Sequence, residues 1–198
     1  MANLKDLKTR INSVKSTQKI TSAMKMVAAA KLRRAQEAAE AGRPYSSRMQ
    51  QVISGLASNA SKATAPALLV GREIIKTHLL IVVSADKGLC AGFNGSIARQ
   101  ARIEIKRLEN EGKSVLLYMV GRKAADNLSR EIADKTFARI ENLQGSGIDY
   151  NKVGEVAEKI LHGFENNSFD SVSIIYNQFV NAITQNNNSK IIFESNEI

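Results

Sequence analysis

The sequence predicts an α/β fold in which a long N-terminal coiled-coil helix precedes a Rossmann-like three-layer α/β domain. Two observations carry this prediction. Up to about residue 58 the chain has few strand formers and spaces its apolar residues as a helix does. From about residue 74, unbroken apolar runs alternate with stretches of helical periodicity, which indicates a parallel or mixed sheet covered by helices. We therefore expect a helix over residues 1–58, a linker over 59–73 and an α/β domain over 74–198.

An apolar seam runs along the predicted helix. Its first residues are three and four positions apart, as in a coiled coil, and the stripe then shifts as a local change of register would shift it. The seam residues are Leu4, Leu7, Ile11, Val14, Ile20 and Val27, with Met24 and Lys31 on the shifted stripe. Alanines then keep the helix slim. Gly42 and Pro44 interrupt the pattern, and we expect a kink or break there.

The predicted helix is too long for its own domain. Some 56 residues at ~1.5 Å each make a rod of roughly 80 Å. An apolar seam must be buried against something, and no other predicted element matches this length. We therefore expect a partner helix outside this sequence, with a solvated, unpartnered helix as the alternative.

The charge of the chain is concentrated in the same region. Met1–Gln50 holds 11 Lys and Arg against 3 Asp and Glu, a net charge of +8, whereas the remaining 148 residues hold 17 against 16, a net of +1. A basic surface along a rod-like helix predicts acidic partners over a long distance.

The rest of the chain alternates strands and helices after a small-residue connection at Ser58–Arg72. The expected strands are Thr77–Ser84, Ser114–Val120, Ser171–Val180 and Lys190–Glu194, with a weak edge strand at Lys135–Ile140. The expected helices are Ser96–Glu111, Arg122–Arg130 and Tyr150–Glu165.

The loop between the first strand and the first helix of the domain, residues 84–95, contains several glycines. A Gly-rich turn at this place can hold a phosphate on helix N-terminal amides. Its spacing matches neither G-x-G-x-x-G nor G-x-x-x-x-G-K-[ST], so a structural turn is the favoured interpretation.

Composition excludes several classes of site. The single cysteine, Cys90, rules out an internal disulfide, and two histidines, His78 and His162, give little material for a metal centre. We interpret both histidines as structural, and we expect no catalytic constellation, cofactor or metal. No apolar run reaches the ~20 residues that span a bilayer, and no apolar signal core precedes the helix. These features predict a soluble, cytoplasmic chain.

Four stretches together resemble the gamma subunit of F-type ATP synthase, the central rotor shaft. They are INSVKSTQKITSAMKMVAAAKLRR at Ile11–Arg34, Arg43–Tyr45, SADKGLCAGFN at Ser84–Asn94, and YNQFVNAIT at Tyr176–Thr184. The resemblance extends from about residue 2 to residue 194, and the stretch at Thr17–Ala29 is highly specific for this family.

The resemblance implies both a fold and a set of partners. The family's N-terminal helix forms an antiparallel coiled coil with a long C-terminal helix, which in the family follows the point where this sequence ends. This pair is the axle inside the ring of alpha and beta subunits, and the α/β domain contacts the epsilon-type subunit and the membrane rotor ring. Catalytic and nucleotide-binding residues lie on other subunits. The residues expected to contact the ring are Met24, Lys25, Lys31, Arg33, Arg34 and Lys87.

The resemblance also implies a location. The protein is expected to be peripheral on the cytoplasmic face of the bacterial cell membrane, or on the matrix side of the mitochondrial inner membrane if it is eukaryotic. Two rival functions remain open. The basic helix could bind nucleic acid, against which the apolar seam and the scarcity of aromatic residues argue. The Gly-rich loop could belong to a small nucleotide-dependent enzyme, against which its motif spacing argues.

Overall fold

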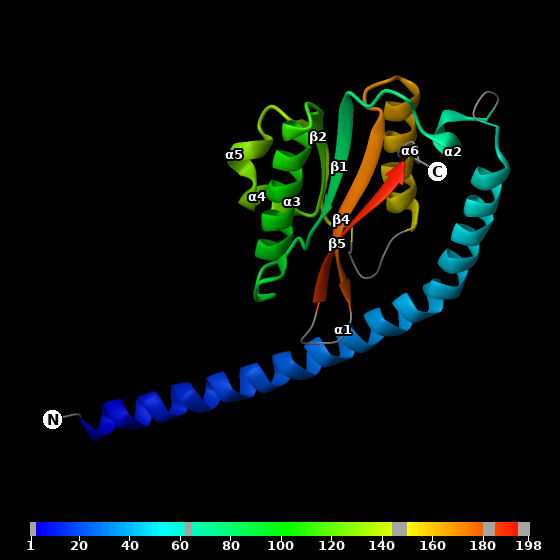
Figure 1. The fold of residues 1–198 in the computed structure, drawn as a ribbon. Coiled ribbons are helices and arrows are strands. Elements are labelled where there is room, and N and C mark those ends of the chain that lie inside the picture. Colours follow the sequence, from blue (N-terminus) through cyan, green and yellow to red (C-terminus); the bar gives the residue numbers. More distant parts are fainter. Residues whose placement is uncertain (1–2, 62–64, 144–149, 180–184, 194–198) are drawn as a thin grey trace. The chain divides into compact units, whose positions relative to one another are not determined.

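The computed structural model describes residues 3–61, 65–143, 150–179 and 185–193. The chain divides into two compact units, Met1–Asn59 and Ala60–Ile198. The first contains one long helix and the second contains the α/β domain (Figure 1).

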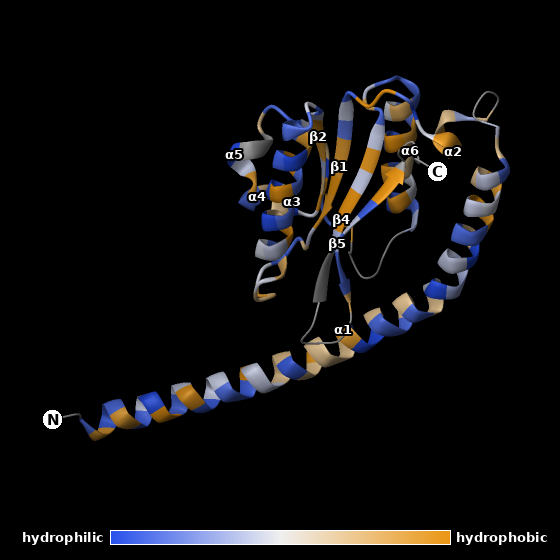
Figure 2. Cartoon of the chain, viewed as in Figure 1, coloured by the Kyte–Doolittle hydropathy of each residue, from blue (hydrophilic) through white to orange (hydrophobic). Residues whose placement is uncertain are grey.

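Helix α1 spans Leu4–Asn59, and none of its 56 residues is buried. Asn3 caps its first turn, where the side-chain oxygen accepts a hydrogen bond from Lys5 N at 3.4 Å. Polar and hydrophobic residues alternate along the whole length of α1, so apolar side chains interrupt its polar surface at regular intervals (Figure 2). The helix therefore owes its form to local propensity and not to a core of its own.

Of the kink or break expected at Gly42 and Pro44, the break is absent, because α1 runs through Pro44 without interruption. Proline removes one backbone donor from the helix, which leaves the hydrogen bonds on either side in place. The hydroxyl of Ser46 also donates to the carbonyl of Arg43 at 3.0 Å, next to the site of the lost bond. The ribbon of α1 curves smoothly over this part (Figure 1), so a gentle bend takes the place of the expected break.

A five-stranded sheet forms the centre of the second unit, in the order β3-β2-β1-β4-β5. Its strands are β1 (Thr77–Val83), β2 (Ser114–Val120), β3 (Thr136–Ile140), β4 (Ser171–Phe179) and β5 (Gln185–Phe193). Strands β3, β2, β1 and β4 run parallel, and β5 pairs antiparallel with β4 at the edge. This mixed sheet confirms the α/β class.

Helices cover both faces of the sheet and give the three predicted layers (Figure 1). On one face, α3 (Phe93–Asn110) and α4 (Arg122–Asn127) pack through Ile97, Ala101, Leu108 and Ala124 against Leu80 and Leu117. On the other face lie α6 (Tyr150–Glu165), with Phe164, and α2 (Ala67–Val70), with Leu68. These two cores use alternate residues of β1, as the two-residue period of a strand requires.

Several predicted elements differ from the structure, among them the helix expected over Ser96–Glu111, which spans Phe93–Asn110. The helix expected over Arg122–Arg130 is divided into α4 and α5 (Ser129–Ile132), because Leu128 leaves the helical conformation (φ −102°, ψ 11°) while its side chain is fully buried. The last strand begins at Gln185 instead of Lys190, since the open edge of β4 pairs with the backbone of this asparagine-rich segment. The region expected to be a linker contains α2. The last residues of the two C-terminal strand predictions, Val180 and Glu194, lie outside the described residues.

Arg72 fixes the segment that leads into β1. Its guanidinium lies 4.4 Å from the centre of the Phe164 ring, donates to the Phe164 carbonyl at 2.6 Å and pairs with Asp170 at 3.6 Å. Asp170 in turn accepts hydrogen bonds from the backbone nitrogens of Lys76 and Thr77, both at 2.9 Å. The entry to the sheet is therefore held to the end of α6 by charged and aromatic contacts together.

Candidate functional site

The candidate site consists of two surfaces, the length of α1 and the loop that follows β1. Every side chain predicted as part of the seam or as a ring contact on α1 is exposed; these are Leu4, Leu7, Ile11, Val14, Ile20, Met24, Lys25, Val27, Lys31, Arg33 and Arg34. The helix thus presents apolar and cationic side chains together.

A seven-residue repeat continues along α1 beyond the residues from which the seam was predicted. Starting from Leu4 and Leu7, the same spacing leads without a change of register to Gln18, Thr21, Lys25, Ala28, Leu32, Ala35, Ala39, Gly42, Ser46, Met49, Ile53 and Leu56. Apolar residues on this stripe, at both ends of α1, are typical of a helix that supercoils with a partner, whereas Gln18, Thr21, Lys25, Gly42 and Ser46 interrupt the apolar pattern in the middle. Sequence reasoning overlooked this continuity because the middle positions are small or polar.

The predicted contacts on α1 lie on more than one face of the helix. Lys25 belongs to the seven-residue stripe, and Met24 and Lys31 occupy the position just before it in successive repeats. Ile20, Val27 and Arg34 are seven residues apart and share a different position. They form a second stripe away from the first, since each residue turns the helix by about 100°.

The cations of α1 are almost all available to a partner. Arg33 alone has an ion pair among the described residues of the helix, with Glu37 one turn later at 2.9 Å. Both side chains are largely exposed, so this pair contributes only ~0.3–0.5 kcal/mol. A partner that presents carboxylates to these Lys and Arg side chains would therefore have to displace few ion pairs within the described part of α1.

Hydrogen bonds from the buried side chain of Asn94 and from Ser84 hold the loop after β1. Asn94 is 7% exposed, accepts from Ala85 N at 3.0 Å, and donates to the Lys87 carbonyl at 3.4 Å and the Cys90 sulfur at 2.9 Å. Ser84 accepts from Ala124 N at 3.0 Å. The polar groups of the turn are therefore hydrogen-bonded to other groups of the same chain, as expected of a structural turn. Lys87 remains exposed on this loop.

Gly121 lets the neighbouring turn approach this loop. It has φ +89°, and a Cβ atom there would lie 2.2 Å from the carbonyl oxygen of Ser84. Only glycine fits both the conformation and the contact. The pattern of glycines in the sequence did not single out this position.

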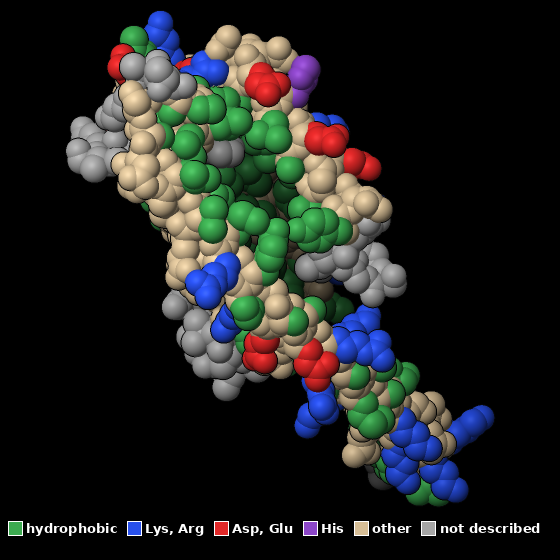
Figure 3. All heavy atoms as spheres, turned by 90° about the vertical axis from the view of Figure 1, so that its right-hand side faces the viewer, with side chains coloured by type: hydrophobic (Ala, Val, Ile, Leu, Met, Phe, Trp, Pro, Cys, Tyr) green, Lys and Arg blue, Asp and Glu red, His purple; other side chains and the backbone are tan. Residues whose placement is uncertain are grey.

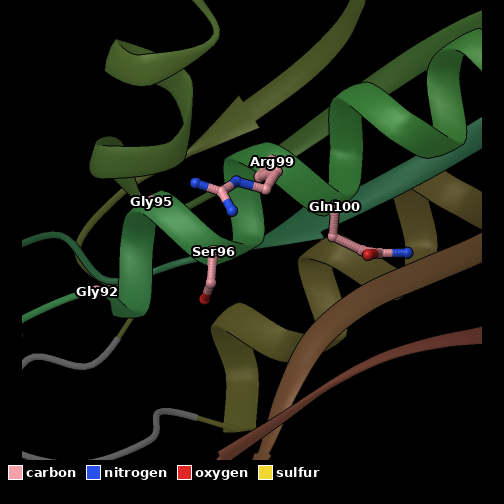
Figure 4. Close-up of a pocket in the computed structure, with 5 residues that line it drawn as sticks. All are labelled: Gly92, Gly95, Ser96, Arg99 and Gln100. Atoms are coloured by element: carbon pink, nitrogen blue, oxygen red, sulfur yellow. The ribbon is translucent and has the colours of Figure 1, made fainter.

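A shallow hollow of about 390 Å³ lies over the first turns of α3 and is lined by Gly92, Gly95, Ser96, Arg99 and Gln100. The side chains of Ser96, Arg99 and Gln100 point in different directions and do not converge on one point (Figure 4). Among the described residues there is also no cluster of His, Cys, Asp and Glu that could hold a metal ion. This hollow gives no basis for a catalytic site.

His78 lies in the core with 2% of its surface exposed. Its Nδ1 is 2.6 Å from the hydroxyl of Ser171 and its Nε2 is 2.7 Å from that of Ser173. Burial, with a smaller contribution from Lys113, lowers the pKa of His78 to about 4. A neutral imidazole bridging two hydroxyls is a structural group, as predicted from the sequence. His162, on α6, has an exposed position and pairs with Asn166 at 3.0 Å.

A third exposed surface lies beside α6. Asp and Glu side chains follow one border of the face drawn in Figure 3, and the exposed Glu155, Glu158 and Glu165 belong to α6. Val153 and Leu161 of α6 are 37% and 38% exposed. The described residues include no helix both long and apolar enough to cross a membrane.

Comparisons with known proteins agree on one family. The family model described as ATP synthase matches residues 3–197. The ATP synthase gamma chain of Pelagibacter ubique is 50% identical over 93% of this chain and 64% of its own length. That of Parvibaculum lavamentivorans is 49% identical over 93% of this chain and 63% of its own length. The chain thus spans somewhat less than two thirds of the length of these curated relatives.

Solved structures lead to the same fold. The central stalk and c-ring structure of the Tetrahymena thermophila mitochondrial ATP synthase contains a chain that matches with a TM-score of 0.65 and 30% identity, over 88% of this chain and 72% of that one. A rotor chain of the Euglena gracilis enzyme matches with a TM-score of 0.55 at 16% identity, over 94% of this chain and 61% of that one, and shows likeness of fold alone.

Proposed function

The chain belongs to the gamma-chain family of ATP synthases, and on this premise we propose that it forms part of the central-stalk rotor of an F-type ATP synthase. In this proposal, ion flow turns the membrane rotor ring and the chain turns with it. The asymmetric axle then acts in turn on the catalytic beta subunits and changes their affinity for nucleotides. The chain itself is non-catalytic and needs no cofactor.

The observation that carries the proposal is the surface of α1. A 56-residue helix with no buried residue, an apolar seven-residue stripe at both ends and exposed cations on its other faces fits an element that is surrounded by protein on all sides. One stripe would receive the long C-terminal helix that the family implies. The other faces, with Met24, Lys31 and Arg34, would meet the alpha and beta subunits.

The two remaining surfaces accommodate the other proposed partners. Lys87, on the loop after β1, would lie near the same ring. The exposed apolar side chains of α6, Val153 and Leu161, are available to the epsilon-type subunit or the membrane rotor ring. The proposed position is peripheral to the membrane, on the cytoplasmic face of the bacterial cell membrane, as the family resemblance implies. A nucleic-acid-binding role explains the cations of α1 but not its apolar stripes.

The proposal is tested by reversing the cations of α1 in the assembled complex. Lys31, Arg33 and Arg34 are changed together to Glu, and ring assembly and coupled ATP turnover are measured. Each exposed pair is worth ~0–1 kcal/mol, so the triple change weakens docking by up to about 3 kcal/mol, or roughly a hundredfold. The control reverses three exposed cations of the α/β domain, Lys76, Lys106 and Arg130, which changes the net charge equally. Equal behaviour of the two triple variants would refute docking through α1.

A further inference from the structure

The seven-residue stripe of α1 has the same arrangement when it is followed from either end. Its apolar side chains gather toward the two ends, and its small and polar side chains lie between them. The apolar residues of the two ends are all exposed, by 41% to 72% of their surface. The stripe runs from Leu4 to Leu56, so its midpoint is position 30. A stripe of this kind can be complementary to a second copy of itself.

Two copies of α1 that run in opposite directions, centred on position 30, bring their apolar ends together. Each pair joins the first position of the repeat in one copy to the fourth position in the other, as in an antiparallel coiled coil. Each contact also occurs twice, because the pair has a two-fold axis. The apolar pairs are Leu4 with Leu56, Leu7 with Ile53 and Ile11 with Met49.

The middle of the stripe is complementary in size under the same pairing. In each remaining pair one of the two side chains is Ala, Gly or Ser. A small neighbour leaves room for the stem of a long polar side chain, whose polar end then reaches water. The pairs that contain the polar residues are Gln18 with Gly42, Thr21 with Ala39 and Lys25 with Ala35. The polar residues that interrupt the apolar pattern are therefore compatible with this pairing.

A parallel pair of α1 helices lacks this match. It would set Lys25 against Lys25 of the second copy, which places two like charges in contact. It would also set Ala35, Ala39 and Gly42 each opposite itself, so the space between the two helices would be poorly filled. The apolar ends fit either direction, and the middle of the stripe selects the antiparallel one.

The charge of α1 opposes the pairing and gives it a distinctive dependence on salt. Residues 1–50 of each copy carry a net charge of +8. Lys31 flanks the stripe next to its midpoint, so it lies beside Lys31 of the second copy. Because salt screens repulsion between exposed charges, pairing of two copies should tighten as ionic strength rises. Binding of the same cations to an acidic partner would weaken instead.

We propose that two copies of this chain associate through α1 as an antiparallel coiled coil centred on position 30. The second copy occupies the stripe that the proposed function assigns to the family's C-terminal helix, so the dimer and the rotor exclude each other. The inference itself needs only α1, and it stands whether or not the chain enters a rotor.

The first test is sedimentation equilibrium of the purified 198-residue chain at low and high salt. Ile11→Ala removes an apolar contact worth about tenfold in affinity from each half of the interface, so the dimer should dissociate about a hundredfold more readily. Ile20→Ala is the matched control and should leave the dissociation constant unchanged. It makes the same substitution in the same helix at a similarly exposed isoleucine, 60% against 52%, but lies off the stripe.

A crosslinking experiment tests the direction of the pair. Ile11→Cys and Met49→Cys are made separately in a Cys90→Ser background, mixed under reducing conditions and then oxidised. The antiparallel pair predicts a disulfide between the two variants and none within either variant alone. At ~1.5 Å per residue, the two copies of position 11 would lie about 57 Å apart.

The two experiments leave the inference open to refutation. A chain that is monomeric at every concentration and salt, or a dimer that Ile11→Ala and Ile20→Ala weaken equally, overturns association through the stripe. Disulfides within each variant alone overturn the antiparallel direction. A dimer that loosens as salt rises contradicts the apolar interface between like-charged helices.

Discussion

Gly121→Ala should destabilise the α/β domain strongly, because two separate costs add at this position. The first is conformational, since Gly121 has φ +89° and ψ 148°, a region used almost only by glycine; the cost for alanine is ~1–3 kcal/mol. The second is steric, because the new Cβ would lie 2.2 Å from the Ser84 carbonyl oxygen and 2.8 Å from its carbon. Both atoms belong to the backbone where the loop leaves β1, and moving them costs a further ~1–3 kcal/mol.

Gly112→Ala is the matched comparison. Gly112 also has a positive φ, +77°, but nothing lies within 4 Å of a Cβ atom built there. Its replacement should therefore cost only the conformational ~1–2 kcal/mol. Urea unfolding, followed by the near-ultraviolet circular dichroism of the tyrosines, gives the free energy of unfolding of both variants. We expect Gly121→Ala to lose at least about 1–2 kcal/mol more than Gly112→Ala. Equal losses would show that the contact with Ser84 does not constrain the loop.

Two further predictions concern acid stability and the unpartnered helix. His78 is held neutral with its pKa lowered to about 4, so below its ordinary value of 6.5 the unfolded chain binds a proton that the folded domain excludes. The contribution of His78 to the free energy of unfolding is therefore fully present above pH 6.5 and falls by up to about 1.4 kcal/mol per pH unit toward pH 4. In urea titrations at several pH values, His78→Gln should flatten this dependence of the unfolding free energy on pH. An unchanged dependence would show that His78 is not its source. In hydrogen exchange, the isolated chain should exchange rapidly over residues 4–59, or self-associate through the stripe, while β1 and β2 are protected. A monomeric chain with a protected α1 would contradict the need for a partner helix.

The elements with strong periodicity could be predicted from the sequence alone. The run Ser114–Val120 and the helix Tyr150–Glu165 have the predicted bounds, because buried strands and amphipathic helices determine their own apolar patterns. Elements whose conformation depends on contacts with other parts of the fold were less predictable from the sequence. The N-terminal part of β5 has little strand propensity and forms on the open edge of β4. Pro44 lies within a continuous helix, where a kink or break was expected.

The candidate site likewise has features that the sequence predicts and features that depend on tertiary contacts. Its charges and its apolar seam can be counted in the sequence. The family resemblance, which rests on four sequence stretches, is confirmed by the family model and by relatives of about 50% identity. The full exposure of Leu89, in the loop after β1, could not be deduced in this way. The backbone of this loop is held by hydrogen bonds from Asn94 and from the turn after β2, which lies some 30 residues further along the chain. Such contacts are tertiary, and the local sequence pattern does not contain them.

Rotation of this chain against the catalytic ring is the central claim, and it can be measured directly. A gold nanorod is attached through a single cysteine at the exposed position Ile103, in a Cys90→Ser background, and the assembled complex is fixed to glass through its ring. During ATP hydrolysis we expect the rod to turn in one direction with one pause for each catalytic beta subunit. A rod that keeps a constant orientation while the complex hydrolyses ATP would contradict the assignment of this chain to the rotor.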